Sequence, residues 1–426
     1  MANPAGDTIV ALSSGRLPAA IAVIRTSGPD ALAAAQAVAG KLPTPRRASL
    51  RNLRDPRDAA LIDRGLVIHF PAPDSSTGEN TVEYQCHGSK AVVAALIAAL
   101  VAQPGMRPAA PGEFTRRALA NGRIDLTQAE GLAELLEAES EAQRKSALLR
   151  AEGALRSQIE RWRGILLDLS AEAEVAIDYA DEDEGGADYD PSDRLAAIIA
   201  SFDTLLTTPR VERLRDGVRL VVAGPPNAGK SSLVNALAGE ARAIVTPIAG
   251  TTRDLVEVNL AIAGIPVTLV DTAGLRDAQD EVEQIGIELA EREIYRADLL
   301  IWLGTSADQP AHPRVLLVAS KADLRNDRAG LRLSVVNGEG VDNLKDWIVS
   351  QARDIMPSSE QPALNQREAG LLMSGRTALM RALTLTNPIL VAEELRAART
   401  ALDTISGRSG VEDLLDALFG RFCLGK

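Results

Sequence analysis

The chain has 426 residues, and 58 acidic against 46 basic side chains give it a formal net charge of −12. This length exceeds one ordinary hydrophobic core and predicts several domains. The excess of acidic side chains excludes binding of nucleic acid through the overall charge of the protein, but it is compatible with a local basic patch. The two cysteines exclude a disulfide framework.

Neither a signal-peptide pattern nor an apolar run of about 18 residues is found in the sequence, so we expect a cytoplasmic protein without a membrane segment. Residues 1–117 mix short apolar runs such as TIVAL and TVEYQCHGS with turn residues, which predicts a small α+β domain. In residues 118–214, leucines and alanines recur every three or four positions, which is typical of a helix bundle.

Residues 217–352 alternate strands with helices. Their near-continuous apolar runs, among them VRLVVAG and RVLLVASKAD, favour a parallel sheet buried on both faces. Residues 356–426 return to helical periodicity. We therefore predict a multidomain α/β and α+β fold, in which an α/β domain is inserted into a discontinuous helical domain. Such an insertion is tolerated where the ends of the inserted domain lie close together.

A phosphate-binding motif lies between the first strand and helix of the α/β segment. GPPNAGKSS at 224–232 matches G-x-x-x-x-G-K-[ST]. Gly224 and Gly229 let backbone amides point inward, where they and the helix N-terminus bind phosphate oxygens. Lys230 supplies a cation to the β- and γ-phosphates, and the Ser231 hydroxyl is placed to coordinate Mg²⁺.

Two further motifs follow in the order that a GTPase requires. In DTAG at 271–274, Asp271 ends a strand and is placed for the Mg²⁺ shell, and the Gly274 amide can sense a γ-phosphate. In SKAD at 320–323, Asp323 can accept two hydrogen bonds from guanine, and the stem of Lys321 can lie over the base. The three motifs together predict a Ras/Era-like P-loop domain that binds GTP.

The position after DTAG departs from Ras-type GTPases, which place there a glutamine that orients the attacking water. Here it is Leu275, which cannot orient water. The residues alone leave the replacement open among five downstream candidates: Arg276, Asp277, Asp280, Glu281 and Glu283.

Six stretches together resemble the MnmE family, also called TrmE. They are TGENTVEYQCHGS, PGEFTRRALANGRIDLTQAE, GPPNAGKSSL, AIVTPIAGTTRD, DTAGLRDAQDEVEQIGIE and the final FCLGK. The resemblance covers nearly the whole chain. Era-like proteins share the GTPase motifs, whereas the N-terminal stretches and the final C-x-G-K are more specific. Members of the family are tRNA-modification GTPases that act with the FAD-carrying protein MnmG on wobble uridine.

The resemblance implies a homodimer, joined by MnmG into a heterotetramer, that acts on tRNA. Its N-terminal domain would dimerise and bind a tetrahydrofolate one-carbon derivative, either 5,10-methylene- or 5-formyl-tetrahydrofolate. The residues around folate would be Arg25, Glu83, Arg123 and Lys426. Arg123 stands where the family more often has lysine, so its contact would differ in geometry. Cys423 would take part in uridine modification, as a nucleophile or by positioning.

For GTP hydrolysis, the resemblance implies a K⁺ ion that offsets charge on the leaving phosphate. Its ligands would be Asn227, Thr246, Ile248 and Thr251. Thr252 would join Ser231 on Mg²⁺, and Glu283 would orient the catalytic water. The complete set of GTP-binding residues that we expect is Asn227, Ala228, Gly229, Lys230, Ser231, Ser232, Thr246, Thr252, Asp271, Thr272, Ala273, Gly274, Ser320, Lys321 and Asp323.

Three departures from the family pattern have structural consequences. Ser320 replaces the usual asparagine, and we expect serine to lose a donor that ties the base-binding loop to the phosphate loop. Ser334 and Val335 replace the usual serine-alanine pair. Only TSADQPAHPR, residues 305–314, separates two strands where an Era-like domain has a helix, and its two prolines leave little room for one.

Other functions are compatible with parts of the sequence. An Era-type regulatory GTPase of ribosome assembly would also hydrolyse GTP, but it would carry an RNA-binding module instead of C-x-G-K. A scaffold with a vestigial GTPase would not need an intact Lys230. Four arginines, Arg46, Arg47, Arg51 and Arg54, contact either tRNA or only solvent. His87 beside Cys86 fits a strand-end turn better than a catalytic pair.

Overall fold

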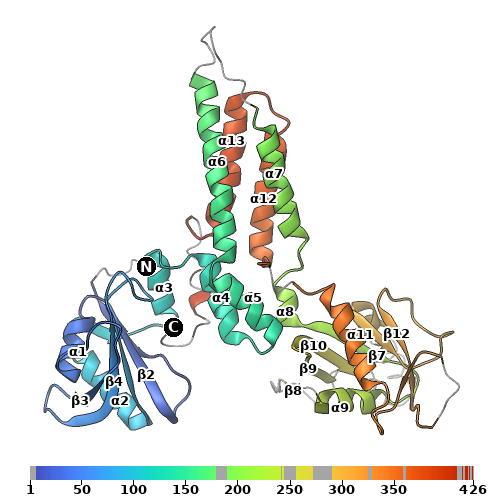
Figure 1. The fold of residues 1–426 in the computed structure, drawn as a ribbon, viewed down its shortest axis with the longest axis horizontal. Coiled ribbons are helices and arrows are strands. Elements are labelled where there is room, and N and C mark those ends of the chain that lie inside the picture. Colours follow the sequence, from blue (N-terminus) through green and yellow to red (C-terminus); the bar gives the residue numbers. More distant parts are fainter. Residues whose placement is uncertain are drawn as a thin grey trace, which may run out of the picture. The chain divides into compact units, whose positions relative to one another are not determined.

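The computed structural model describes residues 6–178, 190–240, 242–243, 256–271, 290–324, 329–357 and 361–409, and also 415, 418–420, 422 and 425. The chain divides into two compact units, Met1–Ala133 with Ser406–Lys426 and Glu134–Ile405. Residues 118–133 and 406–426, which the sequence assigned to the helical domain, fall in the first unit. The predicted fold class, mixed α/β and α+β with a helical bundle, is confirmed (Figure 1).

The first unit is built on a six-stranded sheet with the order β3-β4-β5-β2-β1-β6. Its strands are β1 (Thr8–Leu12), β2 (Ala19–Ser27), β3 (Ser49–Arg54), β4 (Leu61–Phe70), β5 (Thr81–Gly88) and β6 (Met106–Pro108). Helices α1 (Ala31–Ala39) and α2 (Lys90–Val101) pack against one face, where Tyr84 and Leu96 are fully buried. The other face is only partly covered, near β1, by α3 (Glu113–Ala120) through Phe114. Helix α4 (Leu126–Glu137) follows α3.

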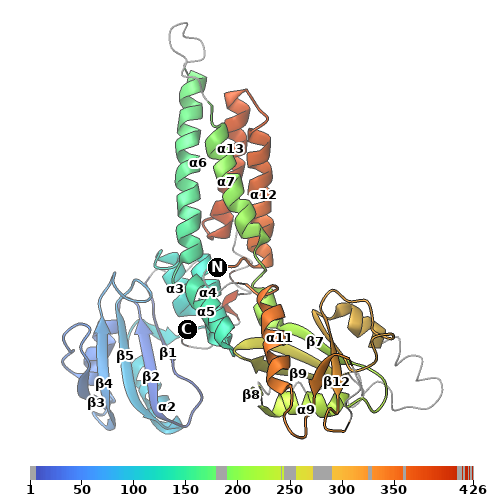
Figure 2. The same ribbon diagram turned by 45° about the vertical axis from the view of Figure 1, so that its right-hand side comes forward.

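Four helices form the bundle of the second unit: α6 (Ala154–Asp178), α7 (Ser192–Thr207), α12 (Gln366–Ala382) and α13 (Pro388–Ile405). They lie side by side in both ribbon views (Figures 1 and 2) and share one apolar core. Trp162 and Phe202 meet at its centre with ring centroids 4.6 Å apart. The core therefore joins segments from before and after the α/β domain in the sequence, as an insertion requires.

Residues 126–178 contain no proline, but they do not form one helix. They form α4, α5 (Glu141–Ala151) and α6 because two local signals interrupt the stretch. Ser140 caps α5 with a capping box that includes Gln143, which starts a new helix there. Gly153, with φ of +89°, separates α5 from α6 because its left-handed backbone ends helical hydrogen bonding.

The chain leaves the bundle and returns to it along two adjacent segments. The outgoing one contains α8 (Glu212–Asp216). The Val211 amide donates to the Leu364 carbonyl at 3.1 Å, and the Gln366 amide donates to the Glu212 carboxylate at 2.8 Å. The ends of the inserted domain are therefore held together by one main-chain bond and one bond to a side chain, which lets that domain fold without disturbing the bundle.

A buried arginine fixes the base of the bundle beside these segments. Arg150 of α5 and Glu368 of α12 are both fully buried and form two hydrogen bonds, of 2.9 and 3.0 Å. Arg150 also donates to the Ala363 carbonyl at 2.6 Å and lies 3.1 Å from a Glu134 oxygen. Burial opposes the charge on Glu368, but Arg150 outweighs it and lowers the pKa of this carboxyl. Desolvation raises the pKa of Glu134 to about 7 in spite of Arg150.

The α/β domain has a seven-stranded sheet with the order β13-β12-β11-β7-β10-β9-β8. Its strands are β7 (Val218–Ala223), β8 (Arg242–Ala243), β9 (Val256–Ile262), β10 (Ile265–Asp271), β11 (Leu299–Trp302), β12 (Val315–Ser320) and β13 (Leu331–Leu333). Its described helices include α9 (Lys230–Glu240) and α11 (Val341–Arg353). Strands β13, β12, β11, β7 and β10 run parallel, so their carboxyl ends meet at one edge.

The predicted shortening between β11 and β12 is confirmed, because residues 303–314 form a loop without a helix. The His312 ring connects the end of this loop to the segment before β11, contacting the Ala297 carbonyl at 3.0 Å and accepting from the Arg314 amide at 3.1 Å. Within the described part of the chain, no helix has the length and apolarity to cross a membrane.

Replacing Glu368 by Gln should destabilise the second unit by about 3 kcal/mol, because Arg150 would keep its buried charge without its two hydrogen bonds to the Glu368 carboxylate. Urea unfolding followed by far-UV circular dichroism measures this loss. The matched control is Glu393→Gln, which breaks an exposed pair with Arg396 on α13 and should leave the unfolding midpoint unchanged. An equal effect of the two substitutions would contradict the importance of the buried pair.

Candidate functional site

The phosphate loop lies where the motif predicts, between the end of β7 and the start of α9. Gly224, with φ of +152°, passes so close to Leu303 that a Cβ would lie 3.0 Å from the Leu303 Cβ. Asn227 and Gly229 also have positive φ, +59° and +94°. These left-handed residues turn successive amides toward one side, and the α9 N-terminus adds its dipole, which together favour a bound phosphate chain.

Two side chains beside the loop are held in place for phosphate and metal chemistry. The Lys230 ammonium is largely buried and donates to the Gly224 and Pro225 carbonyls at 3.1 and 3.0 Å. The Ser231 hydroxyl donates to Asp271 Oδ2 at 2.9 Å. Asp271 ends β10, the strand next to β7, and so lies at the same edge of the sheet. A hydroxyl and a carboxylate in contact form the kind of oxygen pair that Mg²⁺ prefers.

The base-binding segment is tied directly to the phosphate loop. The Ser320 hydroxyl donates to the Ala228 carbonyl at 2.7 Å, and the Lys321 ammonium donates to the Asn227 carbonyl at 2.9 Å. Our expectation that serine would lose this tie is therefore wrong, because the shorter side chain still reaches the loop. The Ser334 hydroxyl donates to Asp323 at 2.7 Å and orients the carboxylate expected to recognise guanine.

The described residues of the predicted GTP site therefore converge at one edge of the sheet. Other predictions fall outside the described residues: Thr246, Ile248, Thr251, Thr252, Thr272, Ala273, Gly274, Glu283, Cys423 and Lys426. Ser232, on the first turn of α9, is exposed.

A second cavity, of about 450 Å³, opens on the face of the first unit's sheet opposite α1 and α2. It brings together three residues that the sequence predicted as a group, Arg25, Glu83 and Arg123. Arg25 and Glu83 are directly opposite each other on β2 and β5 and form a salt bridge of 2.7 Å. Arg123 lies 3.7 Å from Asp74 on the far wall.

The other residues lining this cavity were not predicted: Arg46, Phe70, Asp74, Ser75, Ser76 and Thr81. Arg46 lies over the Phe70 ring, with its guanidinium carbon 5.9 Å from the centroid. The sequence predicts that Arg46 contacts either tRNA or only solvent, since its neighbours in sequence are also basic. The Arg46 amide donates to the His69 carbonyl of β4 at 2.8 Å, and this tertiary contact brings the loop before β3 to the cavity.

A network of charges holds the loop that forms one cavity wall. Arg117 is almost fully buried and bonds Asp7, Glu79 and Glu113. Glu79 in turn accepts from Ser27 at 2.7 Å, which anchors the loop between β4 and β5 to the end of β2. The cavity wall is therefore held by several ion pairs around one buried arginine, which favours a fixed shape.

The neighbouring Cys86 and His87 behave as strand residues. His87 is paired with Asp63 at 2.8 Å and is exposed, whereas Cys86 is buried. Burial and the Asp63 charge raise the pKa of the Cys86 thiol to about 11. A thiol with so high a pKa carries little thiolate near neutral pH, so Cys86 is not suited to nucleophilic chemistry.

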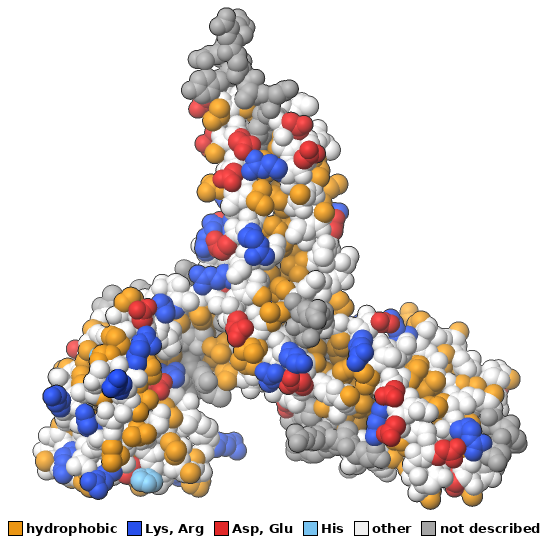
Figure 3. Space-filling model, in the orientation of Figure 1, with side chains coloured by type: hydrophobic (Ala, Val, Ile, Leu, Met, Phe, Trp, Pro, Cys, Tyr) orange, Lys and Arg blue, Asp and Glu red, His pale blue; other side chains and the backbone are white. Residues whose placement is uncertain are grey.

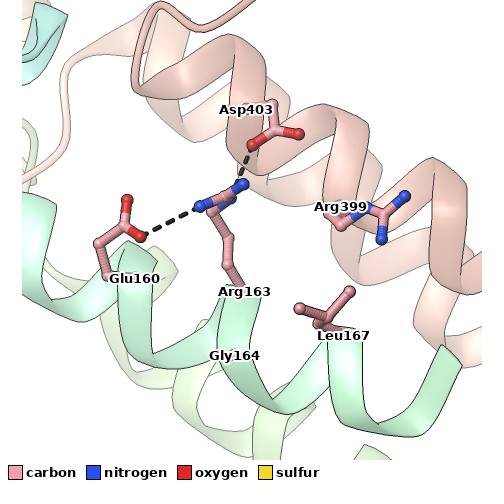
Figure 4. Close-up of a pocket in the computed structure, with 6 residues that line it drawn as sticks. All are labelled: Glu160, Arg163, Gly164, Leu167, Arg399 and Asp403. Atoms are coloured by element: carbon pink, nitrogen blue, oxygen red, sulfur yellow. Dashed lines mark hydrogen bonds and ion pairs between the residues drawn. The ribbon is translucent and has the colours of Figure 1, made fainter. Parts of the chain in front are cut away.

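A further cavity, of about 480 Å³, lies between α6 and α13 (Figure 4). Its charged side chains neutralise one another, since Arg163 bridges Glu160 at 3.0 Å and Asp403 at 2.6 Å, and Arg399 lies on the other helix. Gly164 leaves the groove open, because a Cβ there would meet nothing within 4 Å. These features indicate a solvated groove between two helices and not a ligand-binding site.

Comparisons with known proteins cover nearly the whole chain. The family described as MnmE helical domain matches residues 126–423, and the one described as GTP-binding protein TrmE N-terminus matches residues 8–123. A tRNA modification GTPase MnmE from Novosphingobium aromaticivorans is 48% identical over 436 residues, which cover 99% of this chain and 100% of that protein. One from Rhizorhabdus wittichii is 49% identical over 432 residues, covering 99% and 97%.

The chain belongs to the MnmE family. Membership of the MnmE family confirms the predicted GTP-hydrolysing enzyme. Among solved structures, the G domain of the T. maritima FeoB iron transporter is 26% identical and covers 32% of this chain and 98% of its own, with a TM-score of 0.25. Aquifex aeolicus Era is 22% identical over 38% of this chain and 67% of its own, also with a TM-score of 0.25. Scores this low add nothing to the assignment.

Replacing Ser320 by Ala should weaken GTP binding about fivefold, because the buried Ala228 carbonyl would lose its donor and the phosphate loop its tie to the base segment. Titration with a fluorescent GTP analogue measures the dissociation constant. Ser320→Asn, which restores a donor, should recover most of the affinity. Ser350→Ala, on the exposed side of α11, is the control and should bind normally. Unchanged affinity in Ser320→Ala would show that the tie is unimportant.

Proposed function

We propose that this protein is a K⁺-dependent GTPase of tRNA modification. With the flavoprotein MnmG, it would add an aminomethyl or carboxymethylaminomethyl group to C5 of wobble uridine, using a folate-derived one-carbon unit. The observation that carries this proposal is the presence, in one chain, of a GTPase phosphate loop and a cavity formed by Arg25, Glu83 and Arg123. The relatives named tRNA modification GTPase MnmE match this chain along nearly their whole length.

In the GTPase half of the proposal, Mg²⁺ would be held by Ser231 and Thr252 beside Asp271. The contact between Ser231 and Asp271 fits this, because both donate oxygen ligands. Lys230 would meet the β- and γ-phosphates, and Asp323 and Lys321 the guanine. Glu283 would orient the attacking water in place of the glutamine that Leu275 replaces.

The K⁺ ion would be held by Asn227, Thr246, Ile248 and Thr251, and would supply positive charge next to the leaving phosphate. Asn227 fits this role, because it is exposed at the phosphate loop while its carbonyl is engaged by Lys321. The side-chain amide of Asn227 therefore extends from a backbone that is already held in place. Because this K⁺ ligand is positioned before the reaction, less reorganisation is needed when charge develops on the leaving phosphate.

The N-terminal cavity suits a folate in size and in chemistry. The Glu83 carboxylate can accept hydrogen bonds from the amino and ring N–H groups of a pterin, and Phe70 offers an aromatic surface. Arg46 and Arg123 on the outer wall can pair with the carboxylates of the glutamate portion. The folate would supply the one-carbon unit, with Lys426 and Cys423 completing the site.

A homodimer formed through the first unit has physical support in the open face of its sheet. Ile21, Leu50 and Leu66 stand on the same face as Arg25 and are 61%, 62% and 37% exposed. Exposed apolar side chains gathered on one sheet face are typical of interaction surfaces. A second copy of the same face would cover them and flank the cavity.

Contact with tRNA is supported by exposed arginines on the first unit. Arg46, Arg47 and Arg54 are exposed, and Arg51 is partly so, around β3. On the face seen in Figure 3, Lys and Arg side chains predominate over the N-terminal unit, whereas both signs are mixed along the bundle. A local excess of cations would attract the phosphate backbone although the whole chain is acidic. No observation favours the Era-type alternative.

The proposal predicts that deletion of the gene removes the modified wobble uridine from bulk tRNA, measured by nucleoside mass spectrometry. Wild-type protein should restore it, whereas Cys423→Ser and a chain lacking Lys426 should not. Cys86→Ser is the matched control, because Cys86 is buried away from the cavity chemistry, and it should restore modification. Unchanged tRNA in the deletion strain would overturn the modification function and leave only the GTPase.

Hydrolysis should be faster in KCl than in NaCl of equal ionic strength by about 10²-fold, if K⁺ stabilises the transition state as a fixed charge does. Asn227→Ala should abolish this difference while GTP binding persists, because Lys230 and the loop amides remain. Phosphate release measured in the two salts tests this. Equal rates for the wild type in both salts would remove the ion from the mechanism.

A further inference from the structure

Two carboxylates contact the buried Arg150 at the base of the bundle, and a third acts on them through its charge. Glu368 of α12 binds both terminal nitrogens of the guanidinium, at 2.9 and 3.0 Å. Glu134 of α4 lies 3.1 Å from the remaining nitrogen, Nε. The negative charge of Glu212, on α8, also acts on Glu134. One fully buried cation therefore faces up to three negative charges.

Glu368 is the carboxylate that stays ionised. In addition to its bonds with Arg150, it accepts a hydrogen bond from the Asn365 amide at 2.8 Å. Burial is the largest influence on Glu368 and opposes its charge. Arg150, the Asn365 amide and the charge of Arg367 together outweigh burial and lower the pKa of Glu368. A proton taken up by this cluster therefore does not go to Glu368.

Glu134 has fewer partners than Glu368. Beyond its ion pair with Arg150, the buried Oε2 atom of Glu134 has no hydrogen-bond partner among the described residues. Desolvation raises the pKa of Glu134 to about 7, with Arg150 opposing the shift and the charges of Glu368 and Glu212 adding to it. The Glu134 side chain as a whole is 28% exposed, so it can exchange a proton with solvent.

The same cluster holds both segments that connect the α/β domain to the bundle, residues 208–217 and 361–369, which we call the junction. On the returning segment, Arg150 donates to the Ala363 carbonyl at 2.6 Å. On the outgoing segment, Glu212 accepts from the Gln366 amide at 2.8 Å. A cavity of about 410 Å³, whose lining includes Glu212 and Gln366, gives water a route to this place. The charge on Glu134 therefore acts where the inserted domain joins the bundle.

We propose that this cluster is a proton-operated switch, in which Glu134 gains or loses a proton and thereby sets how firmly the junction is closed. With Glu134 protonated, Glu368 balances the charge of Arg150 and the junction stays closed. When Glu134 releases its proton to solvent, its negative charge repels Glu368 and Glu212 in a site that solvates it poorly. Local opening brings the ionised Glu134 into water, so opening becomes more frequent as pH rises.

Hydrogen exchange of the full chain, measured by mass spectrometry, tests the switch. The Val211 and Gln366 amides bond across the junction and are read from peptides that span residues 208–217 and 361–369. After correction for the intrinsic pH dependence of exchange, opening should rise about tenfold between pH 6 and pH 8 and level off above the Glu134 pKa of about 7. The sign follows because the closed form holds a proton that the open form has already released.

Three substitutions separate Glu134 from its neighbours. Glu134→Gln keeps the shape of the side chain but cannot ionise, so its junction should open as rarely at pH 8 as at pH 6. Glu137→Gln is the matched control, because Glu137 is exposed at the end of the same helix, and it should show the wild-type rise. Glu368→Gln removes the carboxylate that stays ionised, so its junction should open more often than that of the wild type at both pH values.

Equal protection of the wild-type junction at pH 6 and pH 8 would overturn the switch. A rise that persists in Glu134→Gln would also overturn it and would assign the titration to another group, such as one of the three histidines of the chain. The melting temperature at pH 6 checks the variant itself, since a protonated glutamate and a glutamine should be equivalent there. A Glu134→Gln protein that melts well below the wild type at pH 6 would contradict the assignment of the proton to Glu134.

Discussion

The buried pair of Arg150 and Glu368 is the interaction on which the arrangement of the second unit depends. Arg150 joins α5 to the start of α12, and it also holds the Ala363 carbonyl on the segment that returns from the α/β domain. Because an unpaired charge cannot stay at a site with no exposed surface, both helices must keep this register. The main-chain hydrogen bond between Val211 and Leu364 can then hold the two segments that connect the bundle to the α/β domain side by side.

From that base, helix α5 also reaches the inserted domain. The Ala142 amide donates to the Gly264 carbonyl at 3.1 Å, and the Gln143 side chain donates to the Leu214 carbonyl at 2.9 Å. One end of α5 thus contacts the β9–β10 turn and α8, while Arg150 at the other end is locked into the bundle. A short helix with both ends fixed can transmit displacement as a rigid body, unlike a loop.

Within the inserted domain, the parallel sheet brings together the residues of the nucleotide site. The loop after β7, Asp271 at the end of β10 and Ser320 at the end of β12 lie far apart in sequence, but parallel strands bring their carboxyl ends to one edge. The tie from Ser320 to Ala228 makes base and phosphate recognition one connected network. The first unit uses cross-strand pairing instead, with Arg25 opposite Glu83 and the Arg117 network beside them.

The sequence by itself determined the parts governed by local chemistry. Glycine spacing and the following Lys230 defined the phosphate loop, because its geometry is set by backbone freedom within a few residues. The two prolines before β12 predicted the missing helix for the same reason. Apolar periodicity predicted strands and helices, although capping at Ser140 and the turn at Gly153 divided one expected helical stretch.

Only the tertiary structure decided which distant residues meet. It placed Arg46 and Phe70 at the cavity of Arg25, paired Arg150 with Glu368 across 218 positions, and brought Ser13 to Gly425 across 412. It also showed that Ser320 still reaches Ala228, since the strand end lies close enough for a short side chain. Such contacts depend on strand order, helix register and burial, which are properties of the whole chain and leave no local pattern in the sequence.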